Sequence, residues 1–346
     1  MNKKLIINII KNLAFLAIGV FIFWRVFKNV EIEDIKTGFR EVNYFWIALS
    51  IMFAILSQLS RAIRWKMLIK SIDYNPRLIN VFLSTFVLYL VNLIVPRAGE
   101  VARCTVVNRT DKVPFTKLLG TVVVERLADL IMLTLIAIFI FATNLEVIGR
   151  FMELHPEMKE NIQNLLSLRN LIILAVVGIA GIFFVYYLFK KSKNNPNKKE
   201  GKLTHLKHQL AEGLSTILKL KKKVWIFIFH TCFIFFMWLL MLYVVFLAYE
   251  PTSHLTIRTA MVVFLMGGLA MLLPVQGGIG PWHFMIIQTL ILYGIPADPE
   301  GTVFSFIAHT TTQLVYIVLG AVALLIVLFI NQKNLKKEKE IEQSPA

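Results

Sequence analysis

Long apolar runs separated by short polar stretches dominate this chain. A helix needs about 17 to 25 apolar residues to cross the hydrocarbon core of a bilayer, and most of nine apolar segments fall in or near that range. The pattern therefore predicts an all-α polytopic membrane protein. The segments are residues 5–27, 44–60, 78–95, 118–141, 170–189, 224–249, 259–275, 283–296 and 303–330.

The stretches between these segments are too short to form a second domain. The longest, 190–223, has 34 residues and contains eleven lysines. We expect a single integral membrane domain over 1–332 and a short charged cytoplasmic tail over 333–346. The first apolar run lacks a small-residue cleavage site, so it predicts an uncleaved helix and not a removed signal peptide.

Composition narrows the class further. The residues are 57% hydrophobic and only 17% charged, which excludes an ordinary soluble domain. The net charge of +16 could suggest nucleic acid, but the basic residues lie in loops beside apolar segments and are not interleaved with aromatic ones. We therefore expect no nucleic-acid partner. The two cysteines, Cys104 and Cys232, indicate neither a disulfide framework nor a zinc site.

The positive charges also predict a topology. Cytoplasmic loops are enriched in Lys and Arg, which places 61–77, 97–117 and 190–223 in the cytoplasm. Both termini are then cytoplasmic and the number of crossings is even. We expect about eight transmembrane helices in the cell (inner or plasma) membrane.

Segment 78–95 conflicts with this topology because a basic loop lies on each side of it. A reversal within the membrane near Val91–Gly99, through the break at Asn92, Pro96 and Gly99, would resolve the conflict and make this segment re-entrant. The alternative is a single tilted helix whose following loop breaks the charge rule. Segment 283–296 has only 14 residues, so it too could be a partial crossing.

Two Gly/Pro interruptions break the apolar pattern, one in each half, at 92–103 and 272–283. In hydrocarbon, backbone that leaves the helix persists only where protein buries it or where it lines a wet cavity. Paired interruptions in corresponding positions of two halves indicate an inverted repeat and point to a binding site. The interrupting residues are Pro96, Gly99, Pro274, Gly277, Gly278 and Gly280.

Arg61 and Arg64 share a helix face at the end of segment 44–60. Two guanidiniums could hold a lipid phosphate, or they could be end anchors that extend to the interface beside Trp65. Taken alone, the pair favours the anchor interpretation.

Glu100 lies three residues from both Arg97 and Arg103, just after the first interruption. A helix beginning near Ala98 would attract an anion at its N-terminus, and the two arginines would add positive charge. This combination predicts a phosphate site in which Glu100 positions the arginines. An internally paired network at a helix end is the alternative.

Glu125, Arg126 and Asp129 lie inside the start of segment 118–141. Carboxylates within a membrane normally face the interior of a helix bundle, so Glu125 and Asp129 could pair with Arg97, Arg103 or Arg64 from other helices. They could also take up protons or cations during transport. A purely structural ion network is the close alternative.

A weaker polar stripe, His309 and Gln313, occupies the last apolar segment. Such stripes often only join helices, and it gains interest because His283 follows the second interruption. Two imidazoles without a third ligand do not indicate a metal site. In loop 190–223, leucines three or four apart predict an amphipathic helix that binds anionic inner-leaflet headgroups, with a solvated basic linker as the equal alternative.

Together these motifs resemble a family over nearly the whole chain. They are Arg61-x-x-Arg64-Trp65, Asn92-x-x-x-Pro96-Arg97-x-Gly99-Glu100-x-x-Arg103, Glu125-Arg126-x-x-Asp129 and Pro274-x-x-Gly277-Gly278-x-Gly280. The set resembles the flippase-like membrane domain of lysylphosphatidylglycerol synthases. The resemblance implies a helical bundle with re-entrant elements that transfers a phospholipid or polyprenyl-linked lipid between leaflets. It leaves no room here for the aminoacyltransferase domain of two-part relatives, so we expect no enzyme activity.

The leading hypothesis is thus a lipid translocator without cofactor or metal. The sequence has no Gly-x-x-x-x-Gly-Lys-Ser/Thr loop for ATP, so transport would be downhill or ion-coupled. One alternative is a membrane enzyme on lipid headgroups, with Glu100, Glu125 or His283 as general base; another is a scaffold that docks through 190–223. The expected headgroup-binding residues are Arg64, Arg97, Glu100, Arg103, Glu125, Arg126, Asp129, Gln276, Gly277, Gly278, Gly280 and His283.

Overall fold

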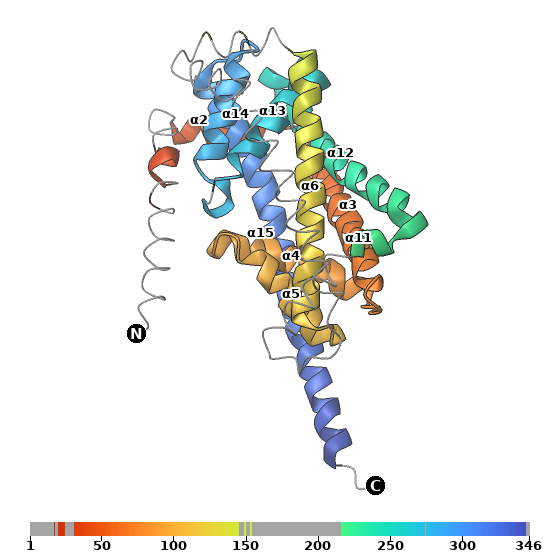
Figure 1. The fold of residues 1–346 in the computed structure, drawn as a ribbon. Helices are drawn as coiled ribbons and strands as arrows, with labels where there is room; N and C mark the ends of the chain where they lie inside the picture. The colour runs from red at the N-terminus through yellow and green to blue at the C-terminus, as the bar shows by residue number, and fades with distance from the viewer. Residues whose placement is uncertain are drawn as a thin grey trace.

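The chain folds as an all-helical protein in a computed structural model that describes residues 31–144, 216–273 and 275–343, with 17, 20–24, 149 and 153 (Figure 1). Most of the predicted segment 5–27, all of 170–189, most of loop 190–223 and Pro274 lie outside the described residues. Within them there is no β-strand, as the apolar pattern predicts.

Four long helices form the body of the described fold: α3 (Tyr44–Lys70), α6 (Phe115–Thr143), α12 (Val224–Ala248) and α15 (Thr302–Gln343). By length and hydropathy, three stretches of the described chain can cross a bilayer, namely Tyr44–Lys70, Lys221–Ala248 and Ala297–Asn334. The shorter elements are α2 (Ile32–Glu41), α11 (Thr216–Lys219), η1 (Lys221–Lys223), η2 (Glu250–Thr252) and η4 (Ala297–Gly301).

Two helices run further than the apolar pattern predicts. Helix α3 continues ten residues past the expected end at 60, because the polar residues there are buried and paired inside the protein. Helix α15 continues through the expected tail to Gln343. The charged segment 333–343 is therefore helical, as its Lys and Glu content favours.

Helices α4 (Leu78–Ile94) and α5 (Gly99–Asp111) form a hairpin, so the chain reverses where the charge pattern predicts. Asp111 at the end of α5 accepts hydrogen bonds from the backbone N–H of Arg77, 2.8 Å, and from Nδ2 of Asn80, 3.0 Å. The two ends of the hairpin therefore lie together. At its tip, a Cβ on Gly99 would be 2.2 Å from the carbonyl oxygen of Leu88, so this close turn requires glycine.

A second hairpin joins α13 (Ile257–Ala270) to α14 (Pro281–Ile291). Helix α13 has 14 residues, about 21 Å at 1.5 Å per residue, which is shorter than a hydrocarbon core of about 30 Å. Its Gly267 packs against Trp282 of α14, so α14 returns along α13. Segments 259–275 and 283–296 thus form one hairpin, in place of a full crossing followed by a partial one.

The order of a long helix, a hairpin and a second long helix occurs twice. The first set is α3, α4–α5 and α6, and the second is α12, α13–α14 and α15. Each hairpin packs on the long helix that ends the other set: Phe86 of α4 clusters with Ala323 of α15, and Leu265 of α13 clusters with Ile140 of α6. This exchange is what an internal repeat predicts.

The two central long helices run antiparallel and in close contact. Ser50 of α3 donates to the carbonyl oxygen of Met241, 3.0 Å, and Ser60 bonds Nδ1 of His230 on α12, 2.8 Å. Small buried residues such as Ala54 let these helices approach, as in other membrane bundles. Figure 1 shows α4–α5 toward one end of the molecule and α13–α14 toward the other, the arrangement of an inverted repeat.

Candidate functional site

A buried cluster of charged side chains lies where α3, α5 and α6 meet. Among the described residues it contains four guanidiniums and three carboxylates, so this part has one positive charge in excess. The guanidiniums belong to Arg61, Arg64, Arg103 and Arg126, and the carboxylates to Glu100, Glu125 and Asp129. We call these seven residues the arginine cluster.

Glu125 is the centre of the arginine cluster and is fully buried. Its Oε1 accepts from Nε of Arg61, 3.2 Å, and from Nη2 of Arg64, 3.1 Å. The same oxygen accepts from Nη2 of Arg126, 3.1 Å, while Oε2 pairs with Nη2 of Arg103, 3.0 Å. One carboxylate therefore holds cations from three helices, which explains why a charge is tolerated at this depth.

Asp129, one turn further along α6, completes the inner part of the cluster. Its Oδ1 lies 2.7 Å from Nη2 of Arg64, and its Oδ2 lies 3.0 Å from Nη2 of Arg126. The prediction that the two α6 carboxylates face inward and find arginine partners on other helices is confirmed by these pairs.

Glu100 and Arg126 form the partly exposed rim of the cluster. Glu100 pairs with Nε of Arg103 at 2.7 Å and with Nε of Arg126 at 3.3 Å. Their side chains are 26% and 40% exposed, whereas Arg103 is fully buried. Of the cluster residues, Glu100 and Arg126 are therefore the first that an ion from outside the protein would contact.

The arginines keep hydrogen-bond donors unused. Nη1 of Arg103 and Nε of Arg64 are buried, and neither donates to a partner in the part of the chain that the structure describes. Buried donors of a charged group normally find an acceptor. Together with the excess positive charge, they make the cluster suited to bind an anion with several oxygens, such as phosphate.

Arg61 and Arg64 are not end anchors, so that interpretation was wrong. They are 2% and 0% exposed, and α3 continues beyond them to Lys70. Their pairing with Glu125 and Asp129 compensates for burial, and an anchor at the interface would have no such partner.

Aromatic rings enclose the arginine cluster. The guanidinium of Arg103 lies 4.4 Å from the ring centroid of Trp65, and that of Arg61 lies 5.3 Å from Trp238. Arg61 also donates to the hydroxyl of Tyr89, whose ring stacks on Tyr316 with centroids 4.0 Å apart. The sequence did not identify either tyrosine as part of the site. An aromatic residue within an apolar run gives no sign that its hydroxyl contacts a charged group.

Arg97 lies apart from this cluster, against the expectation that it flanks Glu100. It sits in the turn before α5 with a positive φ of 64°, so the three-residue spacing of a helix does not apply to it. Its exposed guanidinium donates to the carbonyl oxygen of Leu272, 3.2 Å away at the tip of the other hairpin. Glu100 pairs instead with Arg126, on α6.

The second hairpin tip places several of the remaining predicted residues together. The carbonyl oxygen of Gly277 accepts from Nε2 of His309, 2.9 Å, and from Nε2 of Gln313, 3.0 Å. His283 is buried beside His309, with ring centroids 4.5 Å apart. Positive φ values at Gly277, Gly278 and Gly280 form the turn, next to buried Gln276.

The two interruptions therefore meet, at the contact of Arg97 with Leu272 and where Gly277 approaches Leu93. Residues 12–320 match the family described as the lysylphosphatidylglycerol synthase TM region. The chain belongs to this family.

The chain is similar to the UPF0104 membrane protein MJ1595 of Methanocaldococcus jannaschii, with 29% identity over 149 residues. This similarity covers 42% of each protein, so the chain spans less than half the length of that relative. No solved structure matches the chain. The family name refers to the membrane region of those synthases, and the match shows no catalytic domain.

In this family member, α15 links the second tip to the arginine cluster. His309, Gln313 and Tyr316 are spaced four and three residues apart, so they follow one face of the helix. Gln313 binds Gly277, and the hydroxyl of Tyr316 accepts from Nε2 of Gln58, 3.3 Å. No group of three metal-ligating side chains occurs in the described ranges.

Proposed function

We propose that this protein is a flippase-like lipid translocator that moves a phospholipid or polyprenyl-linked lipid between the leaflets of the cell membrane, with both termini in the cytoplasm. The observation that carries the proposal is the arginine cluster, with four guanidiniums for three carboxylates, and donors on Arg64 and Arg103 that have no acceptor among the described residues. The excess charge and these donors favour anion binding over a purely structural network. A phosphate diester would supply the missing negative charge and acceptors.

In the proposed binding step, the phosphate of the headgroup competes with Glu100 for its arginine partners. Glu100 pairs with Arg126 at the partly exposed rim and with the buried Arg103 behind it, and a phosphate could pair bidentately with these guanidiniums. An arriving phosphate would bind the same two guanidiniums beside Glu100 and weaken the ion pairs of this carboxylate. Because Glu100 lies in the first turn of α5, beside the hairpin tip, this change would act on the hairpin.

The stripe His309, Gln313 and Tyr316 provides the path away from the cluster. These polar side chains would bond a headgroup between the two hairpin tips while the acyl chains stay in hydrocarbon. Discontinuous helices that meet near the middle of a bundle are where transporters place their substrates.

The test is a leaflet assay in vesicles that contain purified protein. A fluorescent anionic phospholipid is added to one leaflet, and its transfer is followed by chemical quenching from outside. We expect Arg126→Gln to slow transfer at least ten-fold, because it removes the exposed cation and half of the proposed phosphate clamp. The matched control is Lys36→Gln, which removes a cation of an exposed ion pair with Glu33.

Unchanged transfer by the Arg126→Gln protein would contradict the proposal. Mass spectrometry of the same vesicles separates transport from headgroup chemistry. Unaltered lipids agree with a translocator, whereas a new lipid species would favour a membrane enzyme that uses Glu100, Glu125 or His283 as a base.

A further inference from the structure

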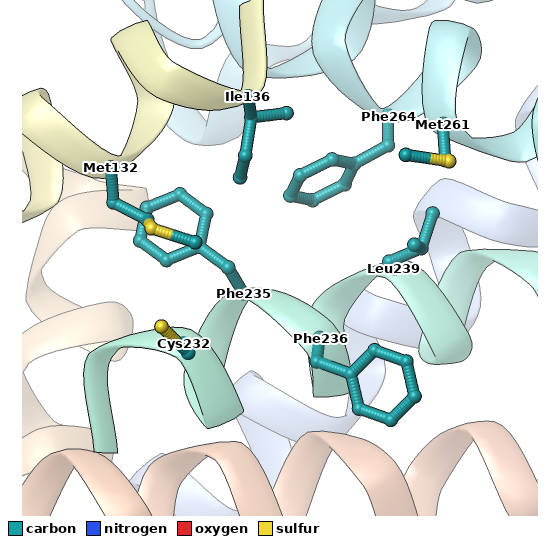
Figure 2. A pocket seen from close by; sticks show the side chains of 8 residues that line it. All are labelled: Met132, Ile136, Cys232, Phe235, Phe236, Leu239, Met261 and Phe264. Carbon is teal, nitrogen blue, oxygen red and sulfur yellow. The ribbon is translucent and has the colours of Figure 1, made fainter. Parts of the chain in front are cut away.

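An apolar pocket of about 160 Å³ lies between α6, α12 and α13 (Figure 2). The described residues that line it include no charged side chain. Figure 2 shows Met132 and Ile136 of α6 facing aromatic side chains of α12 and α13 across it. The lining residues are Met132, Ile136, Cys232, Phe235, Phe236, Leu239, Met261 and Phe264.

The pocket continues the arginine cluster along α6. Glu125, Asp129, Met132 and Ile136 are spaced four, three and four residues apart, so they form one stripe on this helix. The first two bind guanidiniums and the last two line the pocket. A single helix face therefore changes from charged to apolar within one turn.

Helix α12 shows the same change. Thr231 accepts from Nη1 of Arg64, 3.0 Å, and Phe235, one turn later, lines the pocket. The Trp238 ring joins the two parts, because it lies 5.3 Å from the guanidinium of Arg61 and 5.3 Å from the ring of Phe235. Charged cluster and apolar pocket thus adjoin on two separate helices.

We propose that this pocket holds one acyl chain of an anionic phospholipid whose phosphate binds the arginine cluster. The inference rests on the proposed function and adds the tail site to it. Along the stripe, charged residues are followed by apolar ones, just as the charged phosphate of a phospholipid is followed by its apolar acyl chains. The pocket is large enough for several methylene groups, and its described lining has no charged group to bind a headgroup.

Such a pocket can fix the position of an acyl chain by its shape, but it adds little hydrophobic free energy of binding. Bilayer hydrocarbon is as apolar as the lining, so transfer of a chain from lipid to pocket has little hydrophobic driving force. The phosphate contacts supply the affinity, and the pocket fixes where the first part of the tail lies. Binding in the pocket should therefore depend on the charge of the headgroup.

A photoreactive lipid can probe this site. Phe235 lines the pocket and is buried, so it reports on the pocket better than the exposed Phe236. The protein is reconstituted in vesicles with a phosphatidylglycerol that carries a diazirine in one acyl chain. After illumination, the labelled peptides are identified by mass spectrometry. We expect label at Phe235, reduced at least five-fold by excess unlabelled phosphatidylglycerol and not by diacylglycerol.

A filled pocket gives the second arm. Ile136→Trp should lower this labelling at least five-fold, whereas Leu325→Trp, on the exposed face of α15, should leave it unchanged. Equal competition by diacylglycerol, or full labelling of Ile136→Trp, would overturn the tail site. The competition arm needs no pocket variant, so misfolding of Ile136→Trp does not decide the matter.

The labelling does not depend on transport. Competed label without lipid transfer would leave the tail site standing and contradict only the translocator. Transfer without competed label would contradict only the tail site.

Discussion

Glu125 is the residue whose negative charge allows the arginines of the cluster to be buried in the protein. Four guanidiniums converge on its carboxylate, three of them fully or almost fully buried. A buried ion pair gains little over an apolar contact, but loss of one partner leaves the others uncompensated. The cost of a substitution here is therefore set by the arginines that remain.

Glu125→Ala should lower the thermal unfolding midpoint strongly, since breaking a buried pair costs about 3–5 kcal/mol. The measurement is tryptophan fluorescence of the detergent-purified protein on heating. Glu33→Ala is the control, because Glu33 forms an exposed pair with Lys36 that contributes little. Equal midpoints for the two variants would show that the cluster is not a buried unit.

Gly99→Ala should also destabilise the protein, for a steric reason. The new Cβ would lie 2.2 Å from the Leu88 carbonyl oxygen and 2.7 Å from Oδ1 of Asn92, so the tip of the first hairpin must open. Gly268→Ala is the matched control, because its Cβ would meet only Leu133 at an ordinary 3.7 Å. The folded fraction after purification, by size-exclusion chromatography, should fall for Gly99→Ala alone.

At the scale of elements, the two hairpins differ in how far sequence predicts them. Basic loops on both sides of segment 78–95 demand a reversal, which α4–α5 provides. The second hairpin has no such signal, because the flanking stretch 249–258 balances one acidic with one basic residue. The short length of 283–296 and the Gly/Pro interruption at 272–283 are the signals that indicate it.

The first hairpin predicts one-sided access to its ends. Asp111 binds the start of α4, so Asn75 and Arg109, both exposed, lie on the same side of the membrane. Asn75→Cys and Arg109→Cys, each in a Cys104→Ala, Cys232→Ser background, should react with a membrane-impermeant maleimide from the same side. Labelling from opposite sides would restore the single tilted helix.

The sequence predicted which type of residue would pair with the buried carboxylates, but it did not predict which arginines would do so. Carboxylates inside an apolar segment need cations, and from this rule the pairing of Glu125 and Asp129 with arginines was correctly predicted. The packing of α3 on α6 brings the cations of Arg61 and Arg64 to these carboxylates. The left-handed turn at Arg97 keeps this third arginine away from them. Sequence spacing alone carries neither fact.

At the scale of the whole molecule, the two halves meet at their hairpin tips. Arg97 of the first tip donates to Leu272 of the second, and His309 and Gln313 fix the second tip from α15. If the halves rock against each other during lipid transfer, as repeat transporters do, this contact must open.

A short bifunctional maleimide should join Arg97→Cys to Leu272→Cys in the same cysteine-free background, and the joined protein should transfer lipid at least five-fold more slowly. Asn75→Cys combined with Leu272→Cys is the control, because α4 separates Asn75 from the tip by about 25 Å. Efficient cross-linking with undiminished transfer would show that the tips do not part.

Helix α15 packs on the first hairpin, where Gly320 meets Phe86 and Leu90. More than two hundred residues lie between these contacts in the chain. During synthesis, α4 and α5 thus leave the ribosome long before their packing partner exists, and the insertion machinery or a chaperone must shield them meanwhile. Nascent chains halted before α15 should be the form most exposed to quality-control proteases.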